Sequence, residues 1–277
     1  MSAQSHQGTD SSTPQDTGPK VLQGATPSKR IGMEQRGASV SALQVNAPED
    51  APANGPFDAV LFDCDGVLVD SEPITNGVLR DMLGELGWKL SPAECMRLFV
   101  GKALKDESEL IVAHTGNPIP EGWMTQFQER RNAALRERLT AIADVHLAVA
   151  QIHTRFGGKI ACASGADRFK VEMQLRKVGL MSYFEGRVFS GYETPRSKPF
   201  PDVYLAAAAA LAVDPTRCAV IEDTVTGVTA GVAAGATVFG YSPAEMGHDA
   251  PGALRIAGAR EVFVSMRDLP GLLGQAC

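Results

Sequence analysis

The chain has 277 residues, 44% of them hydrophobic and 21% charged, which is the balance of a folded protein with a full hydrophobic core. Its formal net charge of -6 argues against a general nucleic-acid binder, because binding to a phosphate backbone needs a concentrated basic surface. The longest nearly unbroken apolar run, residues 203–213, is too short for a membrane span. We therefore expect a monomer in the cytoplasm that binds a small molecule, with no nucleic-acid or membrane partner.

Residues 1–55 are predicted to form a disordered tail, since they are rich in Ser, Gln, Gly, Pro and Thr and have few large apolar side chains. Such a segment cannot bury enough apolar surface to offset the entropy that is lost on ordering. A short apolar run at residues 57–62 then predicts a buried strand. Residues 73–142 follow with helical apolar spacing and predict an inserted all-helical domain, with helices over residues 74–86, 92–99, 104–114 and 122–139.

The rest of the chain alternates between helices and strands. Strands are predicted at residues 159–163, 187–190, 218–221, 237–240 and 261–265, and helices at residues 145–156, 168–178, 201–211 and 227–234, with a short helix at the end. This alternation favours a parallel sheet that is covered by helices on both faces. We therefore predict an α/β fold with a doubly wound parallel sheet, built from residues 56–72 and 143–277 and interrupted by the helical insert of residues 73–142.

Polar residues follow the predicted strands, at the edge where open parallel sheets bind their ligands. The residues at these strand ends, or in the loop before the next helix, are Asp63, Asp65, Ser164, Gly165, Lys198, Glu222 and Asp223. The set offers carboxylates, a hydroxyl group and a lysine to one edge of the sheet. We therefore expect the functional site there.

The chemistry that this set suits is phosphoryl transfer with Mg²⁺. Clustered carboxylates such as Asp63 and Asp223 resist ionisation unless a cation offsets their repulsion. Mg²⁺ prefers carboxylate, carbonyl and water oxygens, and it also neutralises and orients a phosphate. Lys198 adds a fixed positive charge, and Ser164 with the backbone N–H groups after it suits phosphate oxygens at a helix start.

Four stretches resemble the motifs of the haloacid dehalogenase-like phosphatases, in the same order and at the same spacing. The first is DCDGVLVDSE at residues 63–72, which resembles the family motif D-x-D-G-V-L-x-D-S, and the second is Ser164 at the end of a strand. The third is KPFPD at residues 198–202, and the fourth is IEDTVTG at residues 221–227. The resemblance spans residues 57 to about 270. Within the family, the chain is similar to the branch that includes β-phosphoglucomutase and the phosphatases with a helical cap.

The resemblance implies a role for each residue. Asp63 would attack phosphorus and form an aspartyl-phosphate, and Asp65 would protonate the leaving alcohol and then activate water. Mg²⁺ would be held by Asp63, the backbone carbonyl of Asp65 and Asp223, with Glu222 as a direct or indirect contact. Ser164, Gly165 and Lys198 would hold the phosphate of a small phosphate ester. The helical insert would be the cap that closes over the site.

The substrate is predicted from weaker signals. Residues 189–199 look like the corresponding stretch of bacterial 6-phosphogluconate phosphatase-type enzymes, and Arg196 in this stretch could bind an acidic sugar phosphate. Lys102 in the loop of the insert could contact a second anionic group, although a solvated lysine is the simpler alternative. We therefore expect a sugar or sugar-acid phosphate as substrate, with 6-phosphogluconate as one candidate.

Several alternatives remain open from the sequence. A sugar phosphomutase of the β-phosphoglucomutase type would have a His where this chain has Thr75 and a cap Arg where it has Leu104. A true dehalogenase would lack Asp65. A receiver domain would have neither Asp65-Gly66 after its nucleophile nor a helical insert there. A catalytically silent phosphate-binding protein would not need Asp63, Asp65, Lys198 and Asp223 intact. Either protein would fail to hydrolyse p-nitrophenyl phosphate with Mg²⁺.

Overall fold

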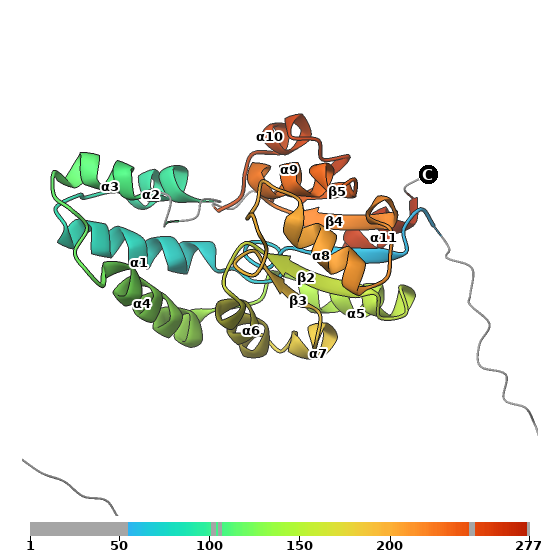
Figure 1. The fold of residues 1–277 in the computed structure, drawn as a ribbon. Coiled ribbons are helices and arrows are strands. Elements are labelled where there is room, and N and C mark those ends of the chain that lie inside the picture. The colour runs from blue at the N-terminus through green and yellow to red at the C-terminus, as the bar shows by residue number, and fades with distance from the viewer. Residues whose placement is uncertain (1–54, 101–103, 105–106, 244–246, 276–277) are drawn as a thin grey trace, which may run out of the picture. The chain divides into compact units, whose positions relative to one another are not determined.

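One six-stranded sheet forms the centre of the fold (Figure 1). The computed structural model describes residues 55–100, 104, 107–243 and 247–275, so that the predicted tail lies outside the described residues apart from its last position. The strands are β1 (Ala59–Phe62), β2 (Ile160–Ser164), β3 (Val188–Ser190), β4 (Cys218–Glu222), β5 (Thr237–Tyr241) and β6 (Glu261–Phe263). They pair in parallel in the order β3-β2-β1-β4-β5-β6, which confirms the predicted fold class.

Helices cover both faces of the sheet because side chains alternate along each strand. In β1, Val60 and Phe62 face one apolar cluster, and Ala59 and Leu61 face the other. The first cluster is completed by α5 (Val145–Arg155), α6 (Arg168–Lys177), α7 (Met181–Phe184) and α11 (Leu269–Gln275). The second is completed by α8 (Asp202–Ala210), α9 (Val225–Ala233) and α10 (Pro251–Ile256).

The helical insert has an apolar cluster of its own. Its helices are α1 (Glu72–Glu85), α2 (Pro92–Phe99), α3 (Ser108–Thr115) and α4 (Trp123–Arg138). Trp88, Phe99, Trp123 and Phe127 are among the large side chains of this cluster. The helix predicted over residues 104–114 begins four residues later in the structure and ends at Gly116, whose left-handed φ of 70° stops the helix.

Two neighbouring segments connect the insert with the sheet. The backbone N–H of Asp70 donates to the carbonyl of Thr140, and the N–H of Ile142 donates to the carbonyl of Leu68. The chain entering the insert is thus hydrogen-bonded to the chain leaving it, within the second half of the first motif.

Two short helices, α7 and α10, are absent from the sequence prediction. They have 4 and 6 residues, which is too short for a helical period to appear in the sequence. None of the described helices combines the length and the apolar character that crossing a membrane requires.

Candidate active site

Three adjacent strands end at one cavity. Asp63 follows β1, Ser164 ends β2, and Asp223 follows β4, and β1 lies between the other two strands. The backbone N–H of Asp63 donates to the carbonyl of Ile221 at 3.0 Å, which fixes the level at which the two loops leave the sheet. All three side chains line a cavity of about 200 Å³ and are almost fully buried. The structure therefore brings together residues that are up to 160 positions apart in the chain, since 223 - 63 = 160.

Lys198 is fixed between two carboxylates. Its Nζ donates to Oδ1 of Asp63 at 2.5 Å and to Oε1 of Glu222 at 2.6 Å, and only 9% of the side chain is exposed. Burial opposes the charge of Lys198, but Asp63 and Glu222 outweigh burial and raise its pKa well above the usual value. The site thus contains a permanent positive charge next to Asp63.

Glu222 has hydrogen-bond donors on both oxygens. Oε1 accepts from Lys198 and, at 2.8 Å, from the hydroxyl of Tyr204. Oε2 accepts from the backbone N–H groups of Asp223 at 3.0 Å and Thr224 at 3.2 Å. Of the two metal roles that the resemblance implies for Glu222, this arrangement favours the indirect one, because the carboxylate already holds Lys198 and the loop after β4.

A cluster of three buried carboxylates could hold a cation. Ligand atoms of Asp63, Glu222 and Asp223 lie within 4.8 Å of one another. Burial raises the pKa of Asp63 to about 7 against the charge of Lys198, and burial together with the charges of Glu222 and Asp63 raises the pKa of Asp223 well above its usual value. Such pKa values mean that the cluster needs a further positive charge to be fully ionised.

Asp223 has an oxygen that is free for a metal. Its Oδ1 is buried and has no hydrogen-bond partner among the described residues. Gly66, at a φ of 78°, lies against the same carboxylate, and a Cβ on Gly66 would be 2.1 Å from Oδ2 of Asp223. A buried carboxylate oxygen without a donor is costly unless a cation coordinates it. The donor set therefore fits a hard divalent ion such as Mg²⁺.

The loop after β2 faces this cluster. Ser164, Gly165 and Ala166 line the cavity, and the hydroxyl of Ser164 accepts a hydrogen bond from the N–H of Ala166 at 3.1 Å. The loop leads into α6, whose first turn is capped by Asp167, since its Oδ1 accepts from the N–H of Lys170 at 2.8 Å. The predicted contact region for phosphate is thus next to the carboxylates, at the start of a helix.

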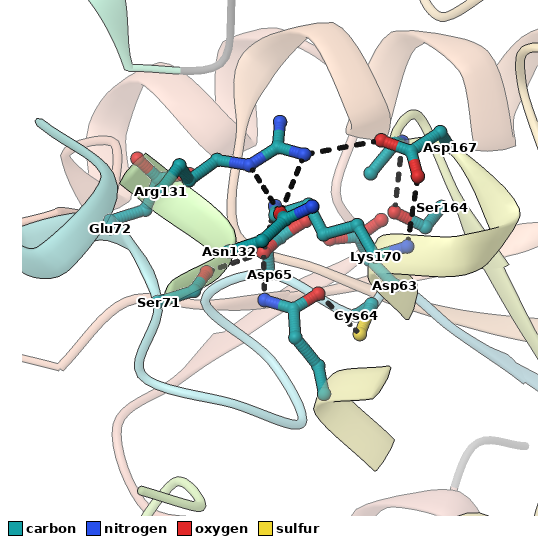
Figure 2. Close-up of polar contacts among 12 residues, drawn as sticks. Asp63, Cys64, Asp65, Ser71, Glu72, Arg131, Asn132, Ser164, Asp167 and Lys170 are labelled. Atoms are coloured by element: carbon teal, nitrogen blue, oxygen red, sulfur yellow. Dashed lines mark hydrogen bonds and ion pairs between the residues drawn. The ribbon is translucent and has the colours of Figure 1, made fainter. Parts of the chain in front are cut away.

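Asp65 is turned toward α6 (Figure 2). Its Oδ1 accepts from Ser71, from Nζ of Lys170 at 2.6 Å and from Nε2 of Gln174 at 2.9 Å. Burial alone would raise the pKa of Asp65, but the charge of Lys170 and the hydrogen bonds outweigh it and lower the pKa to about 2. Asp65 also lines the cavity, so it lies next to the space in which a ligand would bind.

The helical insert also contributes residues to the cavity wall. Arg131 of α4 donates from Nη2 to Asp167 at 3.3 Å and to Oδ1 of Asn132 at 2.9 Å (Figure 2). From α1, Glu72 and Thr75 line the cavity, and the hydroxyl oxygen of Thr75 is buried without a partner among the described residues. The insert also contributes two amides, Asn76 and Gln128, and the apolar side chains of Leu79, Phe99, Leu104, Met124 and Phe127.

Of the two further residues predicted to contact the substrate, the structure describes one. Lys102 lies outside the described residues. Arg196 pairs with Asp202 at 3.0 Å, lies over the ring of Phe200, and is not among the residues that line the cavity. The geometry therefore gives no support to Arg196 as a substrate contact, and its role stays a prediction.

Sequence reasoning missed several residues of the site, among them Arg131, Lys170, Gln174 and Tyr204. Lys170 and Gln174 are four residues apart on the helix after Ser164, and a polar pair on the buried face of a core helix is a signal that could have found them. Arg131 and Tyr204 have no such signal, because only the tertiary fold brings α4 to the cavity and Tyr204 of α8 to Glu222.

The comparisons with known proteins agree with this site. The family model of the haloacid dehalogenase-like hydrolases matches residues 57–235, which include all four motifs. The chain belongs to this family. In its sequence it is similar to 6-phosphogluconate phosphatase of Escherichia coli (28% identical, 66% of this chain and 81% of the relative). It is also similar to hexitol phosphatase B of Escherichia coli (30% identical, 64% and 79%).

A solved structure shows the same fold. The haloacid dehalogenase-family hydrolase of Deinococcus radiodurans, which was solved with bound phosphate and sodium, is 35% identical and has a TM-score of 0.67. The match covers 80% of this chain and 97% of that chain. These comparisons confirm the predicted family and the predicted enzyme class, a phosphatase.

Glu72 gives a prediction for the stability of the metal-free protein. Burial and the charge of Asp65 raise the pKa of Glu72 to about 7 from the ordinary 4.5. Between these two pH values the folded protein binds more protons than the unfolded chain, so stability falls as the pH rises through this range. Glu72→Gln should therefore raise the melting temperature at pH 8 relative to wild type, and by much less at pH 4.5. Thermal unfolding in EDTA at the two pH values measures this, and an equal change at both would contradict it.

Proposed function

We propose that this protein is a Mg²⁺-dependent phosphatase that hydrolyses a small phosphate ester through an aspartyl-phosphate on Asp63. The single observation that supports it most is the position of Lys198 between Asp63 and Glu222, two of the three clustered carboxylates. The third, Asp223, has an oxygen with no partner among the described residues. Phosphoryl transfer to an aspartate needs a nucleophilic carboxylate beside a fixed positive charge and a second carboxylate oxygen that can bind a metal ion.

The residues divide the work of two successive steps. Asp63 attacks phosphorus, and Asp65 gives a proton to the leaving alcohol. Asp65 then takes a proton from the water that cleaves the aspartyl-phosphate. Lys198, Ser164 and the N–H groups from Gly165 onward hold the oxygens of the transferring phosphate, and their fixed positions mean that no reorganisation is needed as charge develops.

The metal ligands that we propose are Asp63, Asp223 and the backbone carbonyl of Asp65, with Glu222 acting through Lys198 and the loop after β4. Bound Mg²⁺ supplies the positive charge that offsets the buried carboxylates and neutralises the phosphate. Asp223 is the best supported of these ligands, because its Oδ1 has no other described partner.

We further propose that residues 73–142 are a cap and that residues 56–72 and 143–277 are the core. The separate apolar cluster of α1 to α4 supports this division, and so do the paired segments around Leu68 and Ile142 that connect the two parts. A cap in this place would exclude water from the site during the first step.

The substrate that we propose is a sugar or sugar-acid phosphate, with 6-phosphogluconate as a candidate. The similarity to 6-phosphogluconate phosphatase and to hexitol phosphatase B supports a polyol or sugar-acid phosphate. Arg131 and Lys198 both line the cavity, and Arg131 of the insert brings a second positive charge that suits a carboxylate of the substrate. A monomer in the cytoplasm, without nucleic-acid partners, remains our prediction.

A sugar phosphomutase is the second candidate in this family. Thr75 and Leu104 both line the cavity and stand where the mutases have a His and an Arg. Neither side chain can replace the charge or the proton-transfer group of those residues. We therefore expect that β-glucose 1-phosphate releases phosphate rather than forming glucose 6-phosphate.

A phosphate-release screen with Mg²⁺ tests the substrate. The panel contains 6-phosphogluconate, hexose and hexitol phosphates, phosphoglycolate, nucleotides and p-nitrophenyl phosphate. We expect the highest kcat/KM with a sugar-acid phosphate, and Arg131→Met should raise KM for that substrate about tenfold, which corresponds to ~1.4 kcal/mol for a charge-assisted hydrogen bond. Arg130→Met is the matched control, since Arg130 pairs with Glu85 on the exposed surface. A clear preference for nucleotides or phosphoglycolate would contradict the proposed substrate class. The absence of turnover with every compound would contradict the proposed phosphatase activity.

A further inference from the structure

The inner face of α6 holds two buried polar side chains that point toward Asp65. Lys170 and Gln174 are one helical turn apart, and they are 5% and 0% exposed. Nζ of Lys170 lies 2.6 Å and Nε2 of Gln174 lies 2.9 Å from the same oxygen, Oδ1 of Asp65 (Figure 2). Buried lysine and glutamine side chains are uncommon in a core that could be apolar, and they mark positions with a specific task.

Three donors together occupy one oxygen of Asp65. Ser71 donates to Oδ1 in addition to Lys170 and Gln174, and the hydrogen bonds from described residues to this carboxylate all end on Oδ1. A carboxylate oxygen has about two lone-pair sites, so that Oδ1 has no place left for a proton. Oδ2 is therefore the oxygen that remains for reacting groups.

Gln174 is itself oriented by a neighbour. Sγ of Cys64 lies 3.9 Å from Oε1 of Gln174 and donates to it, which directs the Nε2 group toward Asp65. Lys170 is the nearest described cation to Asp65, and its ammonium group is balanced by that carboxylate at 2.6 Å. The contacts thus fix both the position and the rotation of the Asp65 carboxylate.

We propose that Lys170 and Gln174 are positioning residues that anchor Asp65 through Oδ1 and leave Oδ2 as the oxygen that exchanges protons with the substrate. This inference rests on the proposed role of Asp65 as acid and base. In the first step the Oδ2–H bond breaks, and the proton goes to the alcohol oxygen as its bond to phosphorus breaks. The substrate-bound site must therefore carry this proton, although the carboxylate is ionised in the free site. In the second step Oδ2 takes a proton from water as the water oxygen bonds to phosphorus and the aspartyl-phosphate bond breaks.

The dependence of the rate on the leaving group separates this role from a structural one. A nitrophenolate leaves without a proton, whereas an alkoxide needs one, so loss of the acid slows alkyl phosphates more than p-nitrophenyl phosphate. We expect Asp65→Asn to lower kcat/KM for the best alkyl phosphate of the screen at least about tenfold more than for p-nitrophenyl phosphate. Lys170→Met should show the same selective loss, and Gln174→Met a smaller loss in the same direction.

The controls use the same helix and the same substitutions. Lys177→Met removes an exposed lysine of α6 and should leave both rates unchanged. Lys170→Arg keeps a charged donor and should recover part of the alkyl activity. Lys170→Met added to Asp65→Asn should change neither rate further, because the acid that it positions is already gone.

The outcomes distinguish the inference from the proposed function. An equal loss with both substrates, or an effect that adds in full to that of Asp65→Asn, would overturn the positioning role. If thermal unfolding shows that Lys170→Met is not folded, Gln174→Met provides the same comparison. If the wild-type protein hydrolyses neither substrate with Mg²⁺, the proposed phosphatase function is wrong. That outcome differs from an active wild type whose Lys170→Met variant loses both activities equally.

Discussion

Replacement of Asp63 by Asn is expected to abolish phosphatase activity. The amide keeps the shape of the side chain but is a poor nucleophile, so no aspartyl-phosphate can form. We expect kcat to fall on the order of 10⁴-fold or more, as for other enzymes that lose a covalent nucleophile. Phosphate release under saturating substrate and Mg²⁺ measures the loss, and acid quenching should trap a phosphoprotein in wild type alone.

The matched control is Asp81→Asn, which removes one carboxylate from an exposed position of α1. Its activity should equal that of wild type. The melting temperature of Asp63→Asn should show that the protein is folded. If folded Asp63→Asn kept activity within tenfold of wild type, the nucleophile would have to be another group, and the proposed mechanism would be wrong.

Removal of Mg²⁺, or of its proposed ligand Asp223, is expected to have the second large effect. EDTA should abolish activity and added Mg²⁺ should restore it. Mg²⁺ at 100 times its dissociation constant should stabilise the wild-type fold by about 2.7 kcal/mol, because a ligand that binds only the folded state adds its binding energy to stability. Asp223→Asn should lose both the activity and this stabilisation.

In EDTA, Asp223→Asn should be at least as stable as wild type. The substitution removes a buried carboxyl group whose ionisation is opposed by burial, Glu222 and Asp63, and whose Oδ1 has no described donor. Asp249→Asn is the matched control, because Asp249 is on the neighbouring loop and its side chain accepts from the N–H of Val225. Thermal unfolding of all three proteins with EDTA and with Mg²⁺ gives the answer. An equal rise in melting temperature for wild type and Asp223→Asn would remove Asp223 from the metal site.

Much of the fold was predictable because its signals are local. The apolar run before Asp63 and the alternation of helices and strands after residue 143 predict a parallel sheet, and the structure confirms it. Sequence patterns fail to predict elements that are too short to show a period, and helix ends that are set by tertiary contacts. The first turns of the helix predicted from residue 104 and the small helices α7 and α10 belong to this group.

The candidate site divides in the same way. The sequence by itself determined which residues stand at the strand ends, among them Asp63, Ser164 and Asp223, because the position after a strand is a property of the local chain. Only the tertiary structure decided that Lys198 lies between Asp63 and Glu222, and that Lys170 reaches Asp65. These contacts join residues more than 20 positions apart, and no periodicity encodes which side chains will share one cavity once helices pack on both faces of the sheet. The charges, the hydrogen bonds and the pKa values of the site follow from that packing.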